Sequence, residues 1–179
     1  EVGSLARGAL ALRAGSSHAL ISAVIISVIT ISTASAAPKM SESHVALLEI
    51  LESDVAPACF NLALLYERGD TVAQSDQHAL QRYQQACALN HALSCNNAGY
   101  MHQAGRGTPA NAANASKAFS YYQKSCELNE GIGCYNVGLQ YYNGTGAPQN
   151  TNLAKQYLRK SCDLAYEDGC KDYALLAEN

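Results

Sequence analysis

CALNHALSC, residues 87–95, places two cysteines on either side of seven residues. The same spacing returns as CELNEGIGC at 126–134 and CDLAYEDGC at 162–170. Structural zinc sites use cysteines two to four residues apart, and redox dithiols use C-x-x-C, so neither kind of site fits this spacing. We therefore expect no metal and no cofactor. The spacing predicts three local disulfides, which are Cys87–Cys95, Cys126–Cys134 and Cys162–Cys170.

The sequence around these cysteines repeats with a period of 36 or 39 residues. The aligned segments are CFNLALLYERG from Cys59, CNNAGYMHQAGRG from Cys95, CYNVGLQYYNGTG from Cys134 and CKDYALLAEN from Cys170. Each segment has the apolar spacing of a helix, and the segment before each disulfide does too. A period in this range is typical of stacked helical pairs. The predicted fold class is all-α, an α/α superhelical solenoid stapled by disulfides.

The repeats divide the chain into six predicted segments. They are a signal peptide (1–36), a degenerate repeat helix (37–55), three repeats (56–90, 91–129 and 130–165) and a C-terminal capping helix (166–179). In the degenerate helix, Leu51 stands 36 residues before Cys87, where a cysteine would be expected. Small residues four positions after a cysteine, such as Gly99 and Gly138, predict close contact between the paired helices.

The first 36 residues have the composition of an export signal. Arg7 and Arg13 precede the uncharged run ALISAVIISVITI at 19–31, and Ala34-Ser35-Ala36 then matches an A-x-A cleavage site. The alternatives are a non-cleaved anchor, a mitochondrial import sequence, or a leaderless chain that starts at Met40. We predict a periplasmic or secreted bacterial protein without stable membrane insertion after cleavage. The mitochondrial intermembrane space is the alternative location.

Charge argues against one class of partner. The chain carries a formal net charge of −3, and its Lys and Arg residues are not clustered. Binding to nucleic acid needs such a cluster to neutralise phosphates. We therefore expect no nucleic-acid partner.

The repeat pattern resembles that of a known family. The pattern C-x-N-x-G-x-x-Y-x-x-G-x-G, followed by A-x-x-Y-x-x-x-C-x-L, is similar to Sel1-like repeats over residues 42–177. It most resembles the secreted subgroup named after the Helicobacter cysteine-rich proteins. This resemblance implies a superhelix related to tetratricopeptide arrays, with one disulfide per repeat. It also implies penicillin binding with weak β-lactamase activity, contacts with peptidoglycan or host cells, or an adaptor role, and a mitochondrial intermembrane-space factor is the eukaryotic parallel.

Catalytic motifs are absent from the sequence. No serine is followed by lysine three residues later, as a serine β-lactamase requires. The histidines do not form a metal-binding motif, and His91 is interpreted as a solvated turn residue. Cys59 is interpreted as a buried structural cysteine rather than as a nucleophile. The paired glycines at 105/107 and 144/146 are interpreted as helix-capping turns rather than phosphate cradles. Whether the protein is an enzyme stays open, and its catalytic residues are unknown.

Binding residues are easier to nominate. Asn61, Asn97 and Asn136 each follow a cysteine by two residues, on the helix that lines the concave face of helical solenoids. Their amides could bind the backbone of an extended ligand, or could form hydrogen bonds between neighbouring helices. In the tyrosine pairs 121/122 and 141/142, one ring should be buried and the other more exposed. We predict an exported scaffold that binds a peptide, a protein or a peptidoglycan fragment, with weak hydrolysis of β-lactams as the alternative.

Overall fold

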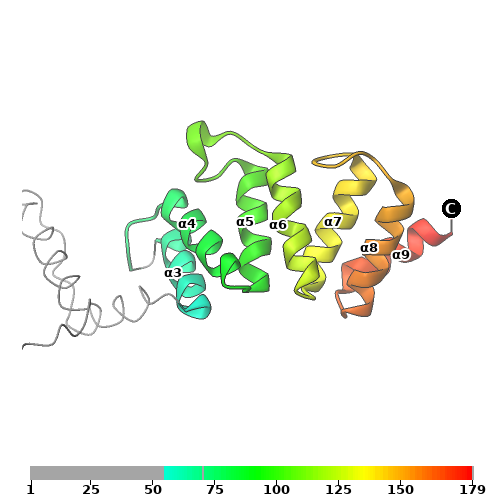
Figure 1. Ribbon diagram of the computed structural model, residues 1–179, viewed down its shortest axis with the longest axis horizontal. Coiled ribbons are helices and arrows are strands. Elements are labelled where there is room, and N and C mark those ends of the chain that lie inside the picture. The colour runs from blue at the N-terminus through cyan, green and yellow to red at the C-terminus, as the bar shows by residue number, and fades with distance from the viewer. Residues whose placement is uncertain (1–54, 70, 179) are drawn as a thin grey trace, which may run out of the picture. The chain divides into compact units, whose positions relative to one another are not determined.

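Seven α-helices make up the computed structural model, which describes residues 55–69 and 71–178 (Figure 1). They are α3 (Ala56–Arg68), α4 (Asp76–Ala88), α5 (Ala92–Ala104), α6 (Ala115–Glu127), α7 (Gly131–Asn143), α8 (Thr151–Asp163) and α9 (Glu167–Ala177). A short 3₁₀ turn, Pro109–Asn111, lies in the longer loop between α5 and α6. These two ranges contain no strand, and none of their helices is long and apolar enough to cross a bilayer. The predicted signal peptide and nearly all of the degenerate repeat helix lie outside the described residues.

The helices pack in the order in which they follow one another along the chain. Each helix from α3 to α8 contacts the next one, and α7 also touches both α5 and α9. Figure 1 shows the resulting row of antiparallel helices, from α3 in cyan to α9 in red. This arrangement confirms the predicted α/α solenoid.

The two kinds of helix begin and end with different signals. The even-numbered helices α4, α6 and α8 begin after Ser75, Asn114 and Asn150, whose side-chain oxygens accept a hydrogen bond from a backbone N–H of the first turn. The odd-numbered helices α3, α5 and α7 end at glycines with left-handed φ angles of 76°, 73° and 68°. The sequence predicted helix-capping turns at Gly105 and Gly144, and the structure confirms both.

Three disulfides join the end of each even-numbered helix to the start of the following odd-numbered helix. They are Cys87–Cys95, Cys126–Cys134 and Cys162–Cys170, with Cα atoms 4.4 to 4.7 Å apart. The intervening turns are short because a residue with positive φ, such as Asn90 or Asn129, reverses the chain after the helix. Cys59 is buried in α3 and lies outside these three disulfides, as the sequence predicted.

Small residues let the paired helices approach closely. A Cβ atom added at Gly99 of α5 would lie 2.7 Å from Tyr122 Cε1 of α6 and 3.2 Å from the Ala118 carbonyl oxygen. At the equivalent Gly138 of α7, it would lie 2.9 Å from Leu158 Cγ of α8. The predicted packing role of these glycines is therefore confirmed.

The interpretation of His91 as a solvated turn residue is wrong. Its side chain is half-buried, and its ring lies 4.7 Å from that of Phe60. Its Nδ1 atom accepts a hydrogen bond from the backbone N–H of Ser94 at 3.3 Å, which caps α5. His91 thus starts the helix that follows the first disulfide turn. Histidine is an uncommon N-cap, so the sequence pattern did not indicate this role.

Candidate functional site

One surface repeats along the odd-numbered helices, and we call it the odd-helix face. It consists of the residues two, five and eight positions after the first cysteine of each odd-numbered helix. These are Asn61, Leu64 and Glu67 on α3; Asn97, Tyr100 and Gln103 on α5; Asn136, Leu139 and Tyr142 on α7; and Asp172, Leu175 and Glu178 at and just beyond α9. Tyr100, Tyr142 and Leu175 are large side chains that remain 54%, 44% and 62% exposed. The face therefore combines amides with exposed apolar and aromatic groups.

We call the space between two successive odd-numbered helices on this face a slot. A tyrosine of α4 fills the first slot, which lies between α3 and α5. Tyr83 is fully buried, and its hydroxyl donates a hydrogen bond to Glu67 Oε2 at 2.7 Å. Burial, and then the Glu67 carboxylate, raise the pKa of Tyr83 well above its usual range. The Asn97 amide acts on the same hydroxyl in the opposite direction and lowers the pKa of Tyr83 by a smaller amount. The first slot is therefore closed by a buried ring whose hydroxyl is hydrogen-bonded to Glu67.

An ion-pair network supports the first slot from the loop after α5. The Arg106 guanidinium lies 2.9 Å from Glu67 Oε1 and 2.6 Å from Asp76 Oδ1. Its Nε donates a further hydrogen bond to Asp76 Oδ2 at 3.1 Å. Hydrogen bonding to Asp76 is the main reason that the pKa of Arg106 is raised. Because Glu67 also accepts from Tyr83, this network fixes the first slot against the second repeat.

A tyrosine of α6 fills the second slot in the same way. Tyr122 is 2% exposed, and its hydroxyl donates to Gln103 Oε1 at 2.8 Å. Burial raises the pKa of Tyr122 well above its usual range, and the nearby Tyr100 adds to this effect. The second slot is therefore also closed.

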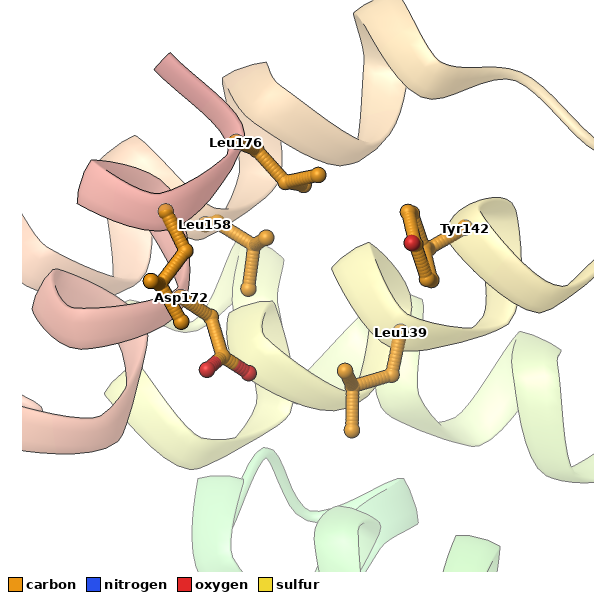
Figure 2. A pocket seen from close by; sticks show the side chains of 6 residues that line it. Leu139, Tyr142, Leu158, Asp172 and Leu176 are labelled. Carbon is orange, nitrogen blue, oxygen red and sulfur yellow. The ribbon is translucent and has the colours of Figure 1, made fainter. Parts of the chain in front are cut away.

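The third slot, between α7 and α9, is open. The residue of α8 equivalent to Tyr83 and Tyr122 is Leu158, which has no aromatic ring and no hydroxyl. A pocket of about 190 Å³ occupies this place, lined by Leu139, Tyr142, Leu158, Asp172, Leu175 and Leu176. Figure 2 shows Leu139 and Tyr142 of α7 facing Asp172 and Leu176 of α9, with Leu158 between them. The odd-helix face is thus indented in its third repeat, whereas its first two slots are filled.

The acidic side chain of this pocket is held by a neighbouring helix. Asp172 is half-buried, and its Oδ2 atom accepts a hydrogen bond from the Tyr135 hydroxyl of α7 at 3.0 Å. Burial, and then this hydrogen bond to Asp172, raise the pKa of Tyr135 to about 12. Tyr135 is therefore protonated at neutral pH and orients the carboxylate of Asp172.

The three asparagines nominated from the sequence have different surroundings. Asn61 is exposed on α3, whereas Asn97 is half-buried beside the Tyr83 hydroxyl. Asn136 donates a hydrogen bond from Nδ2 to Asn96 Oδ1 of α5 at 2.8 Å. Asn136 therefore makes the bond between neighbouring helices that the sequence left open as an alternative. Ligand binding by the three amides stays a prediction.

The two tyrosine pairs divide as the sequence predicted. Tyr122 is buried and Tyr121 is half-buried, with its ring stacked 5.3 Å from that of His102. Tyr141 is half-buried between the rings of Phe119 and Tyr157, whereas Tyr142 is largely exposed. Tyr142 is thereby available at the rim of the pocket.

We expect the buried tyrosines to make stability fall steeply at alkaline pH. Above pH 10, tyrosines of the unfolded chain lose their protons, whereas Tyr83 and Tyr122 keep theirs in the folded chain. Raising the pH therefore favours unfolding, by up to about 1.4 kcal/mol per pH unit for each such tyrosine. Urea unfolding at pH 9 to 11 measures this slope. Tyr122→Phe should reduce this slope by the contribution of one tyrosine. An unchanged slope would contradict the raised pKa of Tyr122.

Two features of the described residues bear on catalytic chemistry. No group of three His, Cys, Asp or Glu side chains there could hold a metal ion. His102 is 4% exposed, and burial lowers its pKa. Its Nε2 lies 2.9 Å from Gln84 Nε2, so this hydrogen bond pairs the imidazole with an amide and not with a serine or cysteine. What the geometry offers is a binding surface with an indentation in its third repeat.

Comparison with known proteins agrees with this architecture. The family model described as Sel1 repeat matches three consecutive segments, residues 56–91, 92–130 and 131–166. A search of the curated proteins gives no match. The second and third segments each begin one residue after the repeat start that the sequence predicts.

Solved structures give the same result. A Sel1 repeat protein from Oxalobacter formigenes aligns with a TM-score of 0.67 and 24% identity, over 75% of this chain and 98% of that chain. Cysteine rich protein B of Helicobacter pylori aligns with a TM-score of 0.56 and 27% identity, over 70% of this chain and 93% of that one. A protective antigen of uropathogenic Escherichia coli aligns with a TM-score of 0.61 and 22% identity, over 64% of this chain but 24% of the antigen.

Proposed function

Because the chain belongs to the Sel1 repeat family, a family of protein-interaction scaffolds, we propose that it binds an extended peptide segment of a partner along its odd-helix face. The observation that carries this proposal is that α5, α7 and α9 each expose a large side chain on this face, namely Tyr100, Tyr142 and Leu175. Repeat proteins of this kind use the surface created by stacking for binding. Exposed aromatic side chains are the residues that most often dominate such interfaces.

The amides of the face supply the polar part of the proposed binding. Asn61 is exposed, and Asn97 is partly exposed. An amide can donate to and accept from the backbone of an extended peptide. Successive amides are one repeat apart, so they can meet such a backbone at regular intervals. Peptide stems of peptidoglycan offer the same chemistry and are the second ligand class within this proposal.

The three disulfides favour a site of action outside the reducing cytosol. Together with the export signal predicted at residues 1–36, they support a periplasmic or secreted protein within this proposal. The intermembrane space of mitochondria, which also permits disulfides, is the alternative compartment. A disulfide map of the protein recovered from the cell envelope would test compartment and pairing together.

Peptide binding can be tested on the full-length oxidised chain. Twelve-residue peptides selected from a random displayed library would be synthesised, and their affinities measured by calorimetry. We expect Tyr100→Glu to weaken binding at least tenfold, because it places a charge at an exposed aromatic position of the face. Selected peptides that bind Tyr100→Glu as well as the unchanged protein would overturn the proposal.

The matched control changes an exposed apolar residue outside the face. Leu89 is 43% exposed and lies in the turn after α4, so Leu89→Glu should leave peptide affinity within twofold. The same preparations also address the β-lactamase alternative. Saturable turnover of nitrocefin that disappears on unfolding would favour an enzyme, whereas binding without turnover would favour the scaffold.

A further inference from the structure

The third slot of the odd-helix face differs from the first two at three equivalent positions. Where Tyr83 and Tyr122 stand in α4 and α6, α8 has Leu158. In the first two slots, Glu67 and Gln103 accept a hydrogen bond from the tyrosine hydroxyl. The equivalent residue of the third slot is Tyr142. The third difference is an acid, Asp172, at the position occupied by an asparagine in α5 and α7. All three changes lie around the pocket of about 190 Å³.

The size and lining of the pocket suit one bulky apolar side chain. Leu139, Leu158, Leu175 and Leu176 provide aliphatic walls, and Tyr142 provides an aromatic one. Engineered apolar cavities of about 150 Å³ take up benzene, so this pocket has room for a ring of that size. In the other two slots, the equivalent residues Tyr83 and Tyr122 place a buried aromatic ring. A ring or branched side chain from a partner could fill the same place.

The charge of Asp172 determines which group of a ligand can lie next to that apolar side chain. Asp172 is the one charged residue among those that line the pocket. Its carboxylate is fixed by the Tyr135 hydroxyl and faces the pocket from α9 (Figure 2). A half-buried carboxylate attracts a cation and repels an anion more strongly than a fully solvated one would. A ligand with a positive group next to its apolar part therefore fits this site better than one with a negative group.

We infer that the third-repeat pocket anchors a bulky apolar side chain of the bound peptide and that Asp172 pairs with a neighbouring Lys or Arg of the same peptide. This inference rests on the proposed function, because it names the residues of the peptide that the odd-helix face selects. The exposure of Tyr142 and Leu175 leaves the pocket accessible from that face. The closed slots at Tyr83 and Tyr122 offer no equivalent space, so this pocket sets the register of the peptide.

A small amine with an aromatic ring tests the pocket chemistry directly. The probe is 4-phenylbutylamine, and 4-phenylbutyrate has the same carbon skeleton with a negative group. In NMR titrations of the full-length chain, we expect the amine to shift the methyl signals of Leu139, Leu158 and Leu176 saturably. The acid should bind at least fivefold more weakly. Equal affinities of the two probes, or no saturable shift with the amine at millimolar concentration, would overturn the inference.

Two changes to the protein separate shape from charge. The double substitution Leu158→Tyr with Tyr142→Gln recreates the residue pair of the second slot, Tyr122 and Gln103, and should abolish the shifts of Leu139 and Leu176. Circular dichroism must show that this variant stays folded. Asp172→Asn keeps the pocket and should reduce the preference for the amine over the acid to less than twofold. Tyr100→Glu lies outside the pocket and should leave the affinity for the amine unchanged.

The selected peptides distinguish failure of this inference from failure of the proposed function. We expect them to share an apolar residue beside Lys or Arg and to lose at least tenfold in affinity on the double substitution. Peptides that depend on Tyr100 but bind the double variant normally would overturn the pocket inference and leave the proposed function intact. Amine binding in the pocket without any peptide that depends on Tyr100 would overturn the proposed function instead. A dimer in sedimentation that the double substitution disperses would identify a second copy of the chain as the occupant and overturn the peptide anchor.

Discussion

Reduction of the three disulfides is expected to unfold the described helices at room temperature. Each disulfide closes a loop of nine residues, and such a loop restricts the unfolded chain by about 2.5 kcal/mol. Three of them contribute about 7 to 8 kcal/mol, whereas small domains are stable by about 5 to 15 kcal/mol in total. Circular dichroism at 222 nm, followed in urea with and without a phosphine reductant, measures the change.

A matched variant isolates one disulfide from the effects of the reductant. Replacing both Cys126 and Cys134 with alanine removes the middle disulfide and leaves the other two. We expect it to lower the free energy of unfolding by about 2.5 kcal/mol. A reduced protein with the same urea midpoint as the oxidised one would show that helix packing alone holds the array, and would remove the main argument for an oxidising compartment.

Gly99→Val is expected to lower the free energy of unfolding by about 3 kcal/mol, more than removal of one disulfide. The first added atom already comes within 2.7 Å of the Tyr122 ring, and the Ala118 carbonyl blocks movement on the other side. Overpacking of this kind typically costs about 1 to 3 kcal/mol, and valine adds two further methyl groups to the same contact. Urea unfolding of the oxidised protein measures the loss.

The chain provides a matched control for this substitution. Ala174 follows Cys170 by four residues, as Gly99 follows Cys95, but its side chain is exposed on α9. Ala174→Val should therefore change the free energy of unfolding by less than about 0.5 kcal/mol. Equal losses from the two valines would show that contact with Tyr122 does not set the cost of a side chain at position 99.

Features that repeat along the chain could be predicted from the sequence. The cysteine spacing and the period of 36 or 39 residues indicate helical pairs without any knowledge of the structure. The glycine ends at 69, 105 and 144 and the close packing at Gly99 follow from simple backbone and steric rules. These features depend on residues close together in the chain or at equivalent places in the repeats, so alignment of the repeats is enough to find them.

The candidate site depends on differences between repeats, and the repeat pattern alone does not predict it. The replacement of Tyr83 and Tyr122 by Leu158 is visible in the sequence, as the residue four positions before each disulfide's first cysteine. The pocket that results cannot be seen in the sequence, because Tyr142, Leu158 and Asp172 come from three helices that only the fold brings together. Likewise, the bond between Asn136 and Asn96 joins residues 40 positions apart.

The packing contacts between the described helices join elements that are one or two apart along the chain, and the disulfides span eight positions each. Native contacts are therefore local, and proteins dominated by local contacts fold quickly. In arrays of this kind, folding can start in any repeat and spread to its neighbours. Amide hydrogens of the central helices α5 to α7 should then exchange with solvent more slowly than those of α9, which gives the molecule a gradient of protection rather than a single cooperative opening.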